Sequence, residues 1–169
     1  MLTITRNLVQ EINAQADVHL YGQEVNPETY AVCKADLFMK TQSGRDADNI
    51  RFGSTLSKEG HVGERFDYLI TNPPYGKDWK MDKEAVRAEH KCSFFGRFGA
   101  GLPRISDGQL LFLQHMVSHM KKPEGGGSRV CIIMNGSPLF TGDAGSGESE
   151  IRRWLMEEDL VEAIIALPE

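Results

Sequence analysis

The decisive stretch of this sequence is Asp67-Tyr68-Leu69-Ile70-Thr71-Asn72-Pro73-Pro74-Tyr75-Gly76, in which an apolar strand runs directly into two prolines and an aromatic residue. Each proline holds its φ near about −65° and lacks a backbone N–H, which keeps Asn72 and Pro73 extended. The strand therefore ends without a helical turn. This pattern predicts a rigid loop that presents carbonyl and carboxamide oxygens beside the ring of Tyr75.

The tetrapeptide Asn72-Pro73-Pro74-Tyr75 suits the methylation of an amino group conjugated to a ring or a carbonyl. Such a nitrogen is a poor nucleophile, so the site must favour the tetrahedral form that appears in the transition state. The Asn72 side-chain oxygen and the Pro73 carbonyl can accept its two N–H bonds and stabilise the developing positive charge. Tyr75 can stack on a planar substrate. The alternative is a plain strand-ending turn.

The pattern of helices and strands predicts an α/β fold with a doubly wound, mostly parallel sheet, because the two kinds of element alternate along the chain. Helices are expected over residues 3–16, 26–39, 108–122 and 150–158. Strands are expected over residues 17–22, 49–53, 66–71, 129–135 and 161–167. The nearly continuous apolar run at 129–135 is typical of a buried parallel strand. Residues 54–65 and 136–149 are expected to be loops.

The length of 169 residues allows one packed domain and is short for two. We expect a single domain over 1–169, with a long loop excursion from the sheet at about 76–107, where no clean period is visible. No apolar run approaches the roughly 18 residues needed to cross a membrane, and the first residues lack the layout of a signal peptide. The sequence thus predicts a cytoplasmic protein without a membrane partner.

Metal and disulfide sites are not expected. Cys33, Cys92 and Cys131 are far apart and form no Cys-x-x-Cys pair, so they are predicted to be buried free thiols. His115 and His119 are four residues apart, but the Glu of a zinc-protease helix is missing between them.

The formal net charge of −5 is unlike that of a domain that binds nucleic acid unaided. If nucleic acid is the substrate, another chain is expected to supply much of the binding. One segment is basic although the chain as a whole is acidic, and its basic residues are interleaved with aromatic ones. This pattern predicts a DNA-facing loop; the alternative is a solvated loop. Its members are Lys77, Lys80, Lys83, Arg87, Lys91, Arg97 and Arg104, with Trp79, Phe94, Phe95 and Phe98.

The Asn-Pro-Pro-Tyr tetrapeptide resembles the catalytic motif of S-adenosylmethionine-dependent amino methyltransferases. Four other segments resemble, in order, the modification subunit of type I restriction systems: YGQEVNPET at 21–29, IRFGSTL at 50–56, GQLLFLQH at 108–115 and IIALP at 164–168. The similarity spans nearly the whole chain. It implies an adenine-specific DNA methyltransferase with a Rossmann-like core that uses S-adenosylmethionine and has three partners: DNA, a specificity subunit and a restriction subunit.

The resemblance also assigns cofactor residues. Glu24, which ends the first short strand, would bond the ribose hydroxyls of S-adenosylmethionine, as acids at this place in doubly wound folds do; its alternative is an ordinary acid beside a helix. Ser54 stands where the family usually carries an acid that bonds the adenine amino group, and a hydroxyl can accept that bond without the charge. Asn72 would contact both cofactor and substrate.

One expected element is missing from this pattern. The family's glycine-rich cofactor loop precedes the opening helix, whereas this sequence starts at Met1-Leu2. We therefore expect a partial methyltransferase core, truncated at both ends, that binds the cofactor poorly alone.

Two other functions remain open at the level of sequence. The same tetrapeptide would suit a methyltransferase that acts on a glutamine amide of a translation protein or on a ribosomal RNA base. The chain would otherwise be a non-catalytic DNA-binding or assembly module. The flanking segments favour the DNA-modifying enzyme over the first of these and leave the second open.

Overall fold

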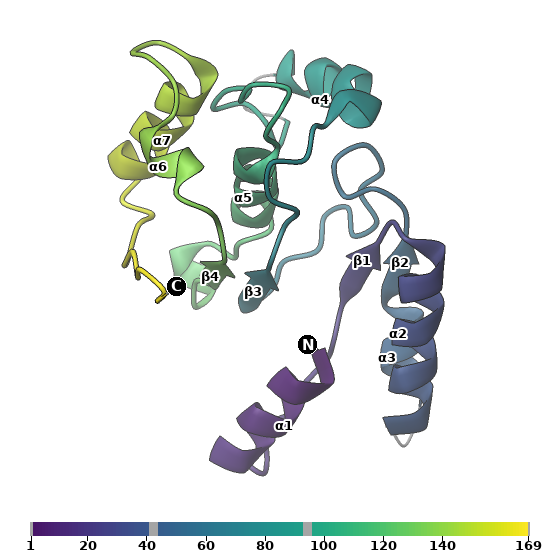
Figure 1. The fold of residues 1–169 in the computed structure, drawn as a ribbon. Coiled ribbons are helices and arrows are strands. Elements are labelled where there is room, and N and C mark those ends of the chain that lie inside the picture. Colours follow the sequence, from purple (N-terminus) through teal and green to yellow (C-terminus); the bar gives the residue numbers. More distant parts are fainter. Residues whose placement is uncertain (1, 41–43, 93–95, 169) are drawn as a thin grey trace. The chain divides into compact units, whose positions relative to one another are not determined.

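The computed structural model describes residues 2–40, 44–92 and 96–168. The chain divides into two compact units, Met1–Val62 and Gly63–Glu169, and each contains a pair of parallel strands (Figure 1). The single-domain organisation over 1–169 stays a prediction. In the described part of the chain, no helix is long and apolar enough to cross a membrane.

The first unit places helices beside a two-stranded parallel pair. Its elements are α1 (Leu2–Ile12), β1 (Gly22–Glu24), α2 (Pro27–Lys40), α3 (Arg45–Asp48) and β2 (Ile50–Phe52). The Asn26 side chain starts α2, because its Oδ1 accepts the backbone N–H groups of Glu28 and Thr29 at 2.9 and 3.0 Å. A core of Leu20, Leu37, Ala47 and Ile50 joins α2, α3 and β2 to the segment before β1.

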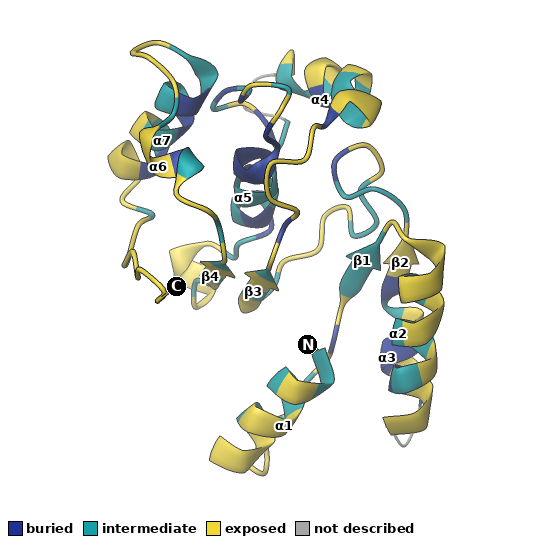
Figure 2. Ribbon diagram, in the orientation of Figure 1, coloured by how far each residue is buried: buried dark blue, intermediate teal, exposed yellow. Residues whose placement is uncertain are grey.

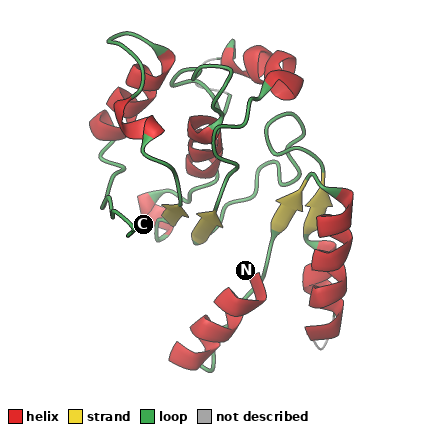
Figure 3. Cartoon of the chain, viewed as in Figure 1, coloured by secondary structure: helices red, strands yellow, loops and turns green. Residues whose placement is uncertain are grey.

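The second unit carries the strand that leads into Asn-Pro-Pro-Tyr. Its elements are β3 (Tyr68–Thr71), η1 (Lys80–Asp82), α4 (Lys83–His90), α5 (Gln109–Ser118), η3 (Pro123–Gly125), β4 (Arg129–Ile132), α6 (Ser137–Phe140) and α7 (Gly147–Glu157) (Figure 3). β3 and β4 are parallel, with Thr71 opposite Ile132. Many residues of α5 are buried (Figure 2). Leu110 of that helix packs with Ile151 and Leu155 of α7.

Several predicted elements differ in extent. The strand expected at 17–22 lies instead at Gly22–Glu24, because these are the residues that pair with β2. The helix expected to reach residue 122 ends at Ser118. Residues 119 and 120 leave it to pair with Phe66, whose backbone N–H donates to the His119 carbonyl at 3.1 Å.

The excursion at 76–107 is not a plain loop, because it contains η1 and α4. The sequence of α4 has no repeating pattern of large apolar residues, because Val86 is the one residue of this helix that is buried. The predicted loop at 136–149 likewise contains the short helix α6 and the start of α7.

The prediction of buried C-terminal strands was wrong. β4 alternates between exposed and half-buried residues, and residues 161–167 form no strand and are exposed. An apolar run indicates that a segment tends to be buried. A strand forms only where a neighbouring strand also provides hydrogen-bond partners, and residues 161–167 have none in a ladder. The prediction of buried thiols was also wrong: Cys131 on β4 and Cys92 are exposed, and Cys33 is only partly buried, which raises the pKa of its thiol.

Candidate functional site

The Asn-Pro-Pro-Tyr loop leaves the sheet at the carboxyl end of β3. The ladder with β4 continues to this point, because the Ile133 N–H donates to the Thr71 carbonyl at 3.1 Å. Asn72 comes immediately afterwards and is exposed, Pro73 is buried, and Tyr75 keeps 46% of its surface accessible. The loop therefore has a buried proline as its base and presents a carboxamide and an aromatic ring to solvent.

Asn72 and Tyr75 are in direct contact. The Tyr75 hydroxyl donates a hydrogen bond to the Asn72 Oδ1 atom. The Asn72 oxygen, predicted to accept the substrate amine, is thus accessible to a donor. In this structure the donor is the hydroxyl of Tyr75, whose ring is expected to stack on the substrate. A planar amine that binds to Asn72 shares this oxygen with the hydroxyl or replaces it.

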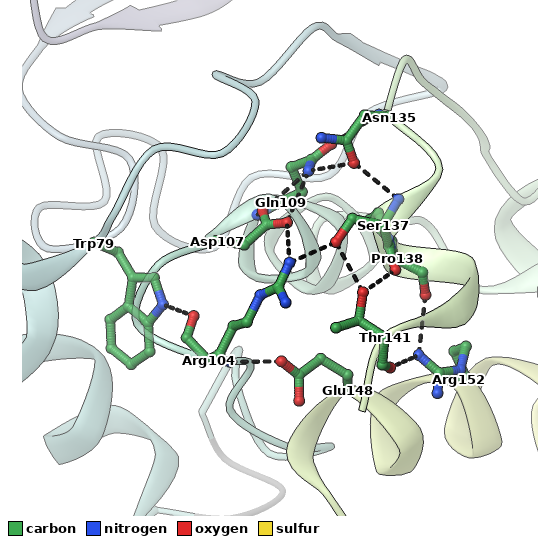
Figure 4. A network of polar contacts seen from close by, with 10 residues as sticks. All are labelled: Trp79, Arg104, Asp107, Gln109, Asn135, Ser137, Pro138, Thr141, Glu148 and Arg152. Carbon is green, nitrogen blue, oxygen red and sulfur yellow. Dashed lines mark hydrogen bonds and ion pairs between the residues drawn. The ribbon is translucent and has the colours of Figure 1, made fainter. Parts of the chain in front are cut away.

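Trp79 anchors the far end of the same loop. Its side chain is only 3% exposed, and its indole N–H donates to the Arg104 carbonyl at 3.0 Å (Figure 4). Its backbone N–H donates to the Ile105 carbonyl at 3.1 Å. Residues 72–78 are therefore held at both ends, by β4 at Thr71 and by residues 104–105 at Trp79. The sequence placed Trp79 on a DNA-facing surface, whereas its burial shows a structural role.

A buried amide network holds the carboxyl end of β4. Gln109, which is fully buried at the start of α5, donates from Nε2 to Asn135 Oδ1 at 3.0 Å and accepts the Asn135 N–H at 3.0 Å (Figure 4). Its Nε2 also lies 3.0 and 3.1 Å from the two carboxylate oxygens of Asp107. The sequence signal was a polar residue inside the apolar run 108–115, which helix periodicity alone does not mark as functional.

Arg104 joins this network. Its guanidinium donates to Ser137 Oγ at 2.8 Å and lies 3.7 Å from Asp107. Its backbone N–H donates to the buried Glu148 of α7 at 2.8 Å. The residues at the end of the excursion are thus fixed to α6 and α7 (Figure 4).

The remaining residues of the basic segment divide between core and surface. Phe98 is fully buried, and Arg97 pairs with Glu89. Phe94 and Phe95 lie outside the described residues. A set of cations on or beside η1 and α4 stays accessible: Lys77, Lys80, Lys83, Arg87 and Lys91. The aromatic part of the predicted DNA-facing loop is therefore wrong where the structure describes it, and the basic part stays a prediction.

Glu89 and Arg97 form a partly buried ion pair with three close contacts. Arg97 donates to the Glu89 carboxylate from its backbone N–H at 2.8 Å, from Nε at 2.8 Å and from Nη2 at 2.7 Å. Burial acts to raise the pKa of Glu89, but the side-chain and backbone hydrogen bonds and the charge of Arg97 together lower it below its usual range. The pair holds the end of α4 against residue 97.

This pair is expected to make the second unit sensitive to acid. Because the pKa of Glu89 is lower in the folded than in the unfolded state, its stabilisation is complete above the unfolded carboxyl pKa, about 4.3, and is lost as the pH falls through the folded value. Glu89→Gln is expected to lower the free energy of unfolding by about 1–3 kcal/mol at pH 7, and by less in acid. Urea denaturation at several pH values measures this; Glu157→Gln, in an exposed pair, serves as the control. A pH-independent difference would contradict the assignment.

Two residues assigned to the cofactor lie together in the first unit. Glu24 and Phe52 are opposite each other at the carboxyl ends of β1 and β2, and the Gly53 N–H donates to the Glu24 carbonyl at 3.0 Å. Ser54 is the next residue. Glu24 thus ends the first strand, as predicted, and Ser54 lies one residue beyond Gly53, just past the neighbouring strand.

Both side chains already make one local bond. Glu24 Oε1 accepts the Asn26 N–H at 2.8 Å, and Ser54 Oγ accepts the Leu56 N–H at 3.3 Å. A carboxylate has a second oxygen, and a serine hydroxyl has a proton to donate. Glu24 therefore keeps acceptor capacity for a hydroxyl ligand, and the chemistry left to Ser54 includes donation as well as the acceptance expected from the sequence.

Within the described residues, no group of three or more histidine, cysteine, aspartate or glutamate side chains is arranged to hold a metal ion. His115 and His119 pack with ring centroids 4.7 Å apart. Nδ1 of His115 lies 3.0 Å from Arg97 Nη1, and Nδ1 of His119 lies 2.8 Å from the Glu64 carbonyl. Both side chains make contacts within the unit.

The sequence profile of the family described as N-6 DNA Methylase matches residues 1–169. Among curated proteins, the type I restriction enzyme HindI methylase subunit of Haemophilus influenzae is 27% identical over 90% of this chain and 31% of its own length. The MjaIX methylase subunit of Methanocaldococcus jannaschii is 26% identical over 90% of this chain and 25% of its own length. The chain thus spans about a quarter to a third of these relatives.

One solved structure shares the fold. The type I restriction-modification system methyltransferase subunit from Streptococcus thermophilus matches with a TM-score of 0.58 and 24% identity, over 83% of this chain and 28% of that chain. With the parallel strand pairs and flanking helices, this likeness confirms the α/β methyltransferase-core fold predicted from the sequence.

Proposed function

The chain belongs to the N-6 DNA methylase family, and from this membership we propose that it is the core of a type I modification subunit that methylates the exocyclic amine of adenine in DNA. The observation that carries the proposal is the pairing of Asn72 Oδ1 with the Tyr75 hydroxyl at the carboxyl end of β3. That contact places an exposed acceptor directly beside an exposed aromatic ring. A flipped purine with an amino group needs both.

The proposed methyl donor is S-adenosylmethionine, which supplies an electrophilic methyl group on a sulfonium. The residues of the first unit fit its nucleoside end, because Glu24 has a carboxylate oxygen beyond the one that bonds Asn26, and Ser54 Oγ has a lone pair beyond the one that bonds Leu56. We assign Glu24 to the ribose hydroxyls and Ser54 to the adenine. Asn72 is assigned to both the cofactor side and the substrate side of the reaction.

In the proposed reaction, Asn72 Oδ1 and the Pro73 carbonyl accept the two N–H bonds of the target amine. These acceptors favour the tetrahedral nitrogen and stabilise its developing positive charge. Pro74 holds Pro73 extended, so that its carbonyl stays available. The nitrogen needs no strong base, because its acidic proton can leave after transfer.

Tyr75→Phe separates the two roles of the tyrosine. The ring remains for stacking, while the hydroxyl that occupies Asn72 Oδ1 is removed. We expect kcat to rise by about fivefold, since the amine no longer competes with the hydroxyl for Asn72 Oδ1 in the transition state, and the affinity for DNA with a flipped or abasic-opposed target to stay unchanged. Single-turnover methylation measures the rate, and fluorescence anisotropy of end-labelled DNA with adenine at the target position measures the affinity.

Tyr75→Ala is the comparison for that experiment. Loss of the ring removes base stacking, which is worth about 1–3 kcal/mol, so this variant is expected to bind the target more weakly than the wild type. Equal weakening in the phenylalanine and alanine variants would show that the hydroxyl itself binds the substrate.

DNA, a specificity subunit and a restriction subunit are the proposed partners. A net charge of −5 supports shared DNA binding, because the chain as a whole does not attract phosphates. Lys83, Arg87 and Lys91 are spaced by four residues and so share one face along α4, which comes after the Asn-Pro-Pro-Tyr loop in the chain. We propose that this face contacts DNA phosphates.

Charge reversal at Arg87 and Lys91 tests the α4 surface. In the assembled enzyme, each variant is expected to weaken DNA binding and to reduce the slope of log K against log salt concentration by about 1. Lys122→Glu, at an exposed position after α5, is the control and should leave the slope unchanged. Unchanged slopes for Arg87→Glu and Lys91→Glu would remove α4 from the DNA-binding surface.

The proposed function is tested by tracing labelled methyl groups from S-adenosylmethionine in the full-length protein. DNA with adenine targets, ribosomal RNA and a glutamine-containing release-factor peptide are offered separately. Label on N6 of adenine in DNA is the expected result. Label on RNA or peptide instead would identify the alternative substrates, and cofactor binding with no transfer to any of them would indicate a non-catalytic module.

A further inference from the structure

Gln23 binds three backbone groups of one loop. It lies on β1 between Gly22 and Glu24, and its Nε2 donates to the Gly53 carbonyl at 3.1 Å and to the Lys58 carbonyl at 2.5 Å. Its Oε1 accepts the Gly60 N–H at 3.0 Å. One carboxamide thus satisfies the start, the middle and the end of residues 53–60, which contain no helix or strand.

The loop lies tightly against the strand pair. A Cβ added to Gly60 would lie 2.6 Å from Cβ of Arg51 on β2, a distance that real side chains do not adopt. Gly53 has a φ of +138°, which favours glycine. Leu56 is buried, with 3% of its surface exposed. The loop is therefore closely packed, and Gln23 adds polar contacts to the bonds that the Leu56 and Lys58 N–H groups make to Ser54.

This conformation determines where Ser54 lies relative to Glu24. Ser54 is bonded to Gly53, whose N–H donates to the Glu24 carbonyl and whose own carbonyl accepts from Gln23. The residue next to Glu24 therefore holds the loop that carries Ser54. The position of Ser54 beside Glu24 therefore depends on the Gln23 side chain.

We propose that Gln23 is a positioning residue for the nucleoside part of S-adenosylmethionine, because it holds Ser54 beside Glu24. This inference rests on the proposed function and deepens it for the cofactor site. Sequence alone did not indicate Gln23, since a glutamine beside the expected ribose acid has no pattern of its own.

Gln23→Glu is the most direct test, since it keeps the size of the side chain and the oxygen that accepts from Gly60. It loses both N–H donors and places a carboxylate against the Gly53 and Lys58 carbonyls. In the full-length protein, we expect KM for S-adenosylmethionine to rise about tenfold, corresponding to one or two lost hydrogen bonds, with kcat at saturating cofactor and KM for DNA unchanged. Gln10→Glu, on the exposed surface of α1, adds the same charge and should change none of these values.

A second readout does not depend on catalysis. Without cofactor, amide hydrogen exchange of residues 53–60 is expected to be faster in Gln23→Glu and Gln23→Asn than in the wild type, and unchanged elsewhere in the first unit. The asparagine variant is shorter and uncharged, so it tests the same bonds if the glutamate variant does not fold.

The outcomes distinguish this inference from the proposed function. Wild-type protein that neither binds nor uses S-adenosylmethionine would overturn both. Wild-type protein that uses the cofactor, together with wild-type KM values in both Gln23 variants, would overturn the positioning role alone. A fall in kcat with no change in KM would also overturn it, because general destabilisation reduces the active fraction and not the affinity for the cofactor.

Discussion

Asn72→Ala is expected to lower kcat for methyl transfer by about 100- to 1000-fold, the range found when a single preorganised acceptor or donor is removed from a transition state. The side-chain oxygen is the one group of the loop that combines exposure with an observed hydrogen bond to the stacking ring. Single-turnover methylation with labelled S-adenosylmethionine measures the loss directly. KM for both substrates should change much less, because the interaction forms mainly in the transition state.

Two variants show whether this loss belongs to the acceptor. Asn72→Asp keeps an oxygen at the same position and is expected to retain more activity than the alanine variant. Asn7→Ala, on the exposed surface of α1, should be fully active. Because Asn72 is exposed, its replacement should shift stability by less than about 0.5 kcal/mol. An alanine variant that is folded and as active as the wild type would remove Asn72 from the reaction.

The local structure around the candidate site was predictable from the sequence because it depends on neighbouring residues. Two prolines after an apolar strand determine where β3 ends and how the chain continues beyond it, and Glu24 falls at the end of β1 where the pattern placed it. Asn26-Pro27-Glu28 likewise predicted the start of α2, because a cap requires only residues within one turn.

Contacts between distant residues were not predictable in the same way. Gln109 meets Asn135 across 26 positions, and Gln23 meets Gly60 across 37. Helix and strand periods report which face is buried and contain no information on which polar groups pair. The sequence did not predict α4 for a related reason. Val86 is its one buried residue, and its other residues are alanine or polar.

Trp79→Ala is expected to destabilise the second unit by about 3–5 kcal/mol, the usual cost of truncating a buried tryptophan. The informative variant is Trp79→Phe, which keeps most of the packing and removes the indole N–H that the Arg104 carbonyl accepts. Because this bond holds the far end of residues 72–78, its loss should displace Asn72 and Tyr75 and lower kcat by about 10- to 100-fold. Unfolding curves and methylation rates of the same preparations separate stability from activity.

Trp154→Phe is the matched control for this variant. Trp154 of α7 packs against the Leu110, Ile151 and Leu155 cluster in the same unit. Both substitutions remove one indole ring, so both should lower the midpoint of thermal unfolding, but only Trp79→Phe should lower kcat in the fraction that remains folded. Equal losses of kcat in the two variants would mean that Trp79 supports the unit as a whole. A loss confined to Trp79→Phe would show that the Asn-Pro-Pro-Tyr loop acts only when it is held at both ends.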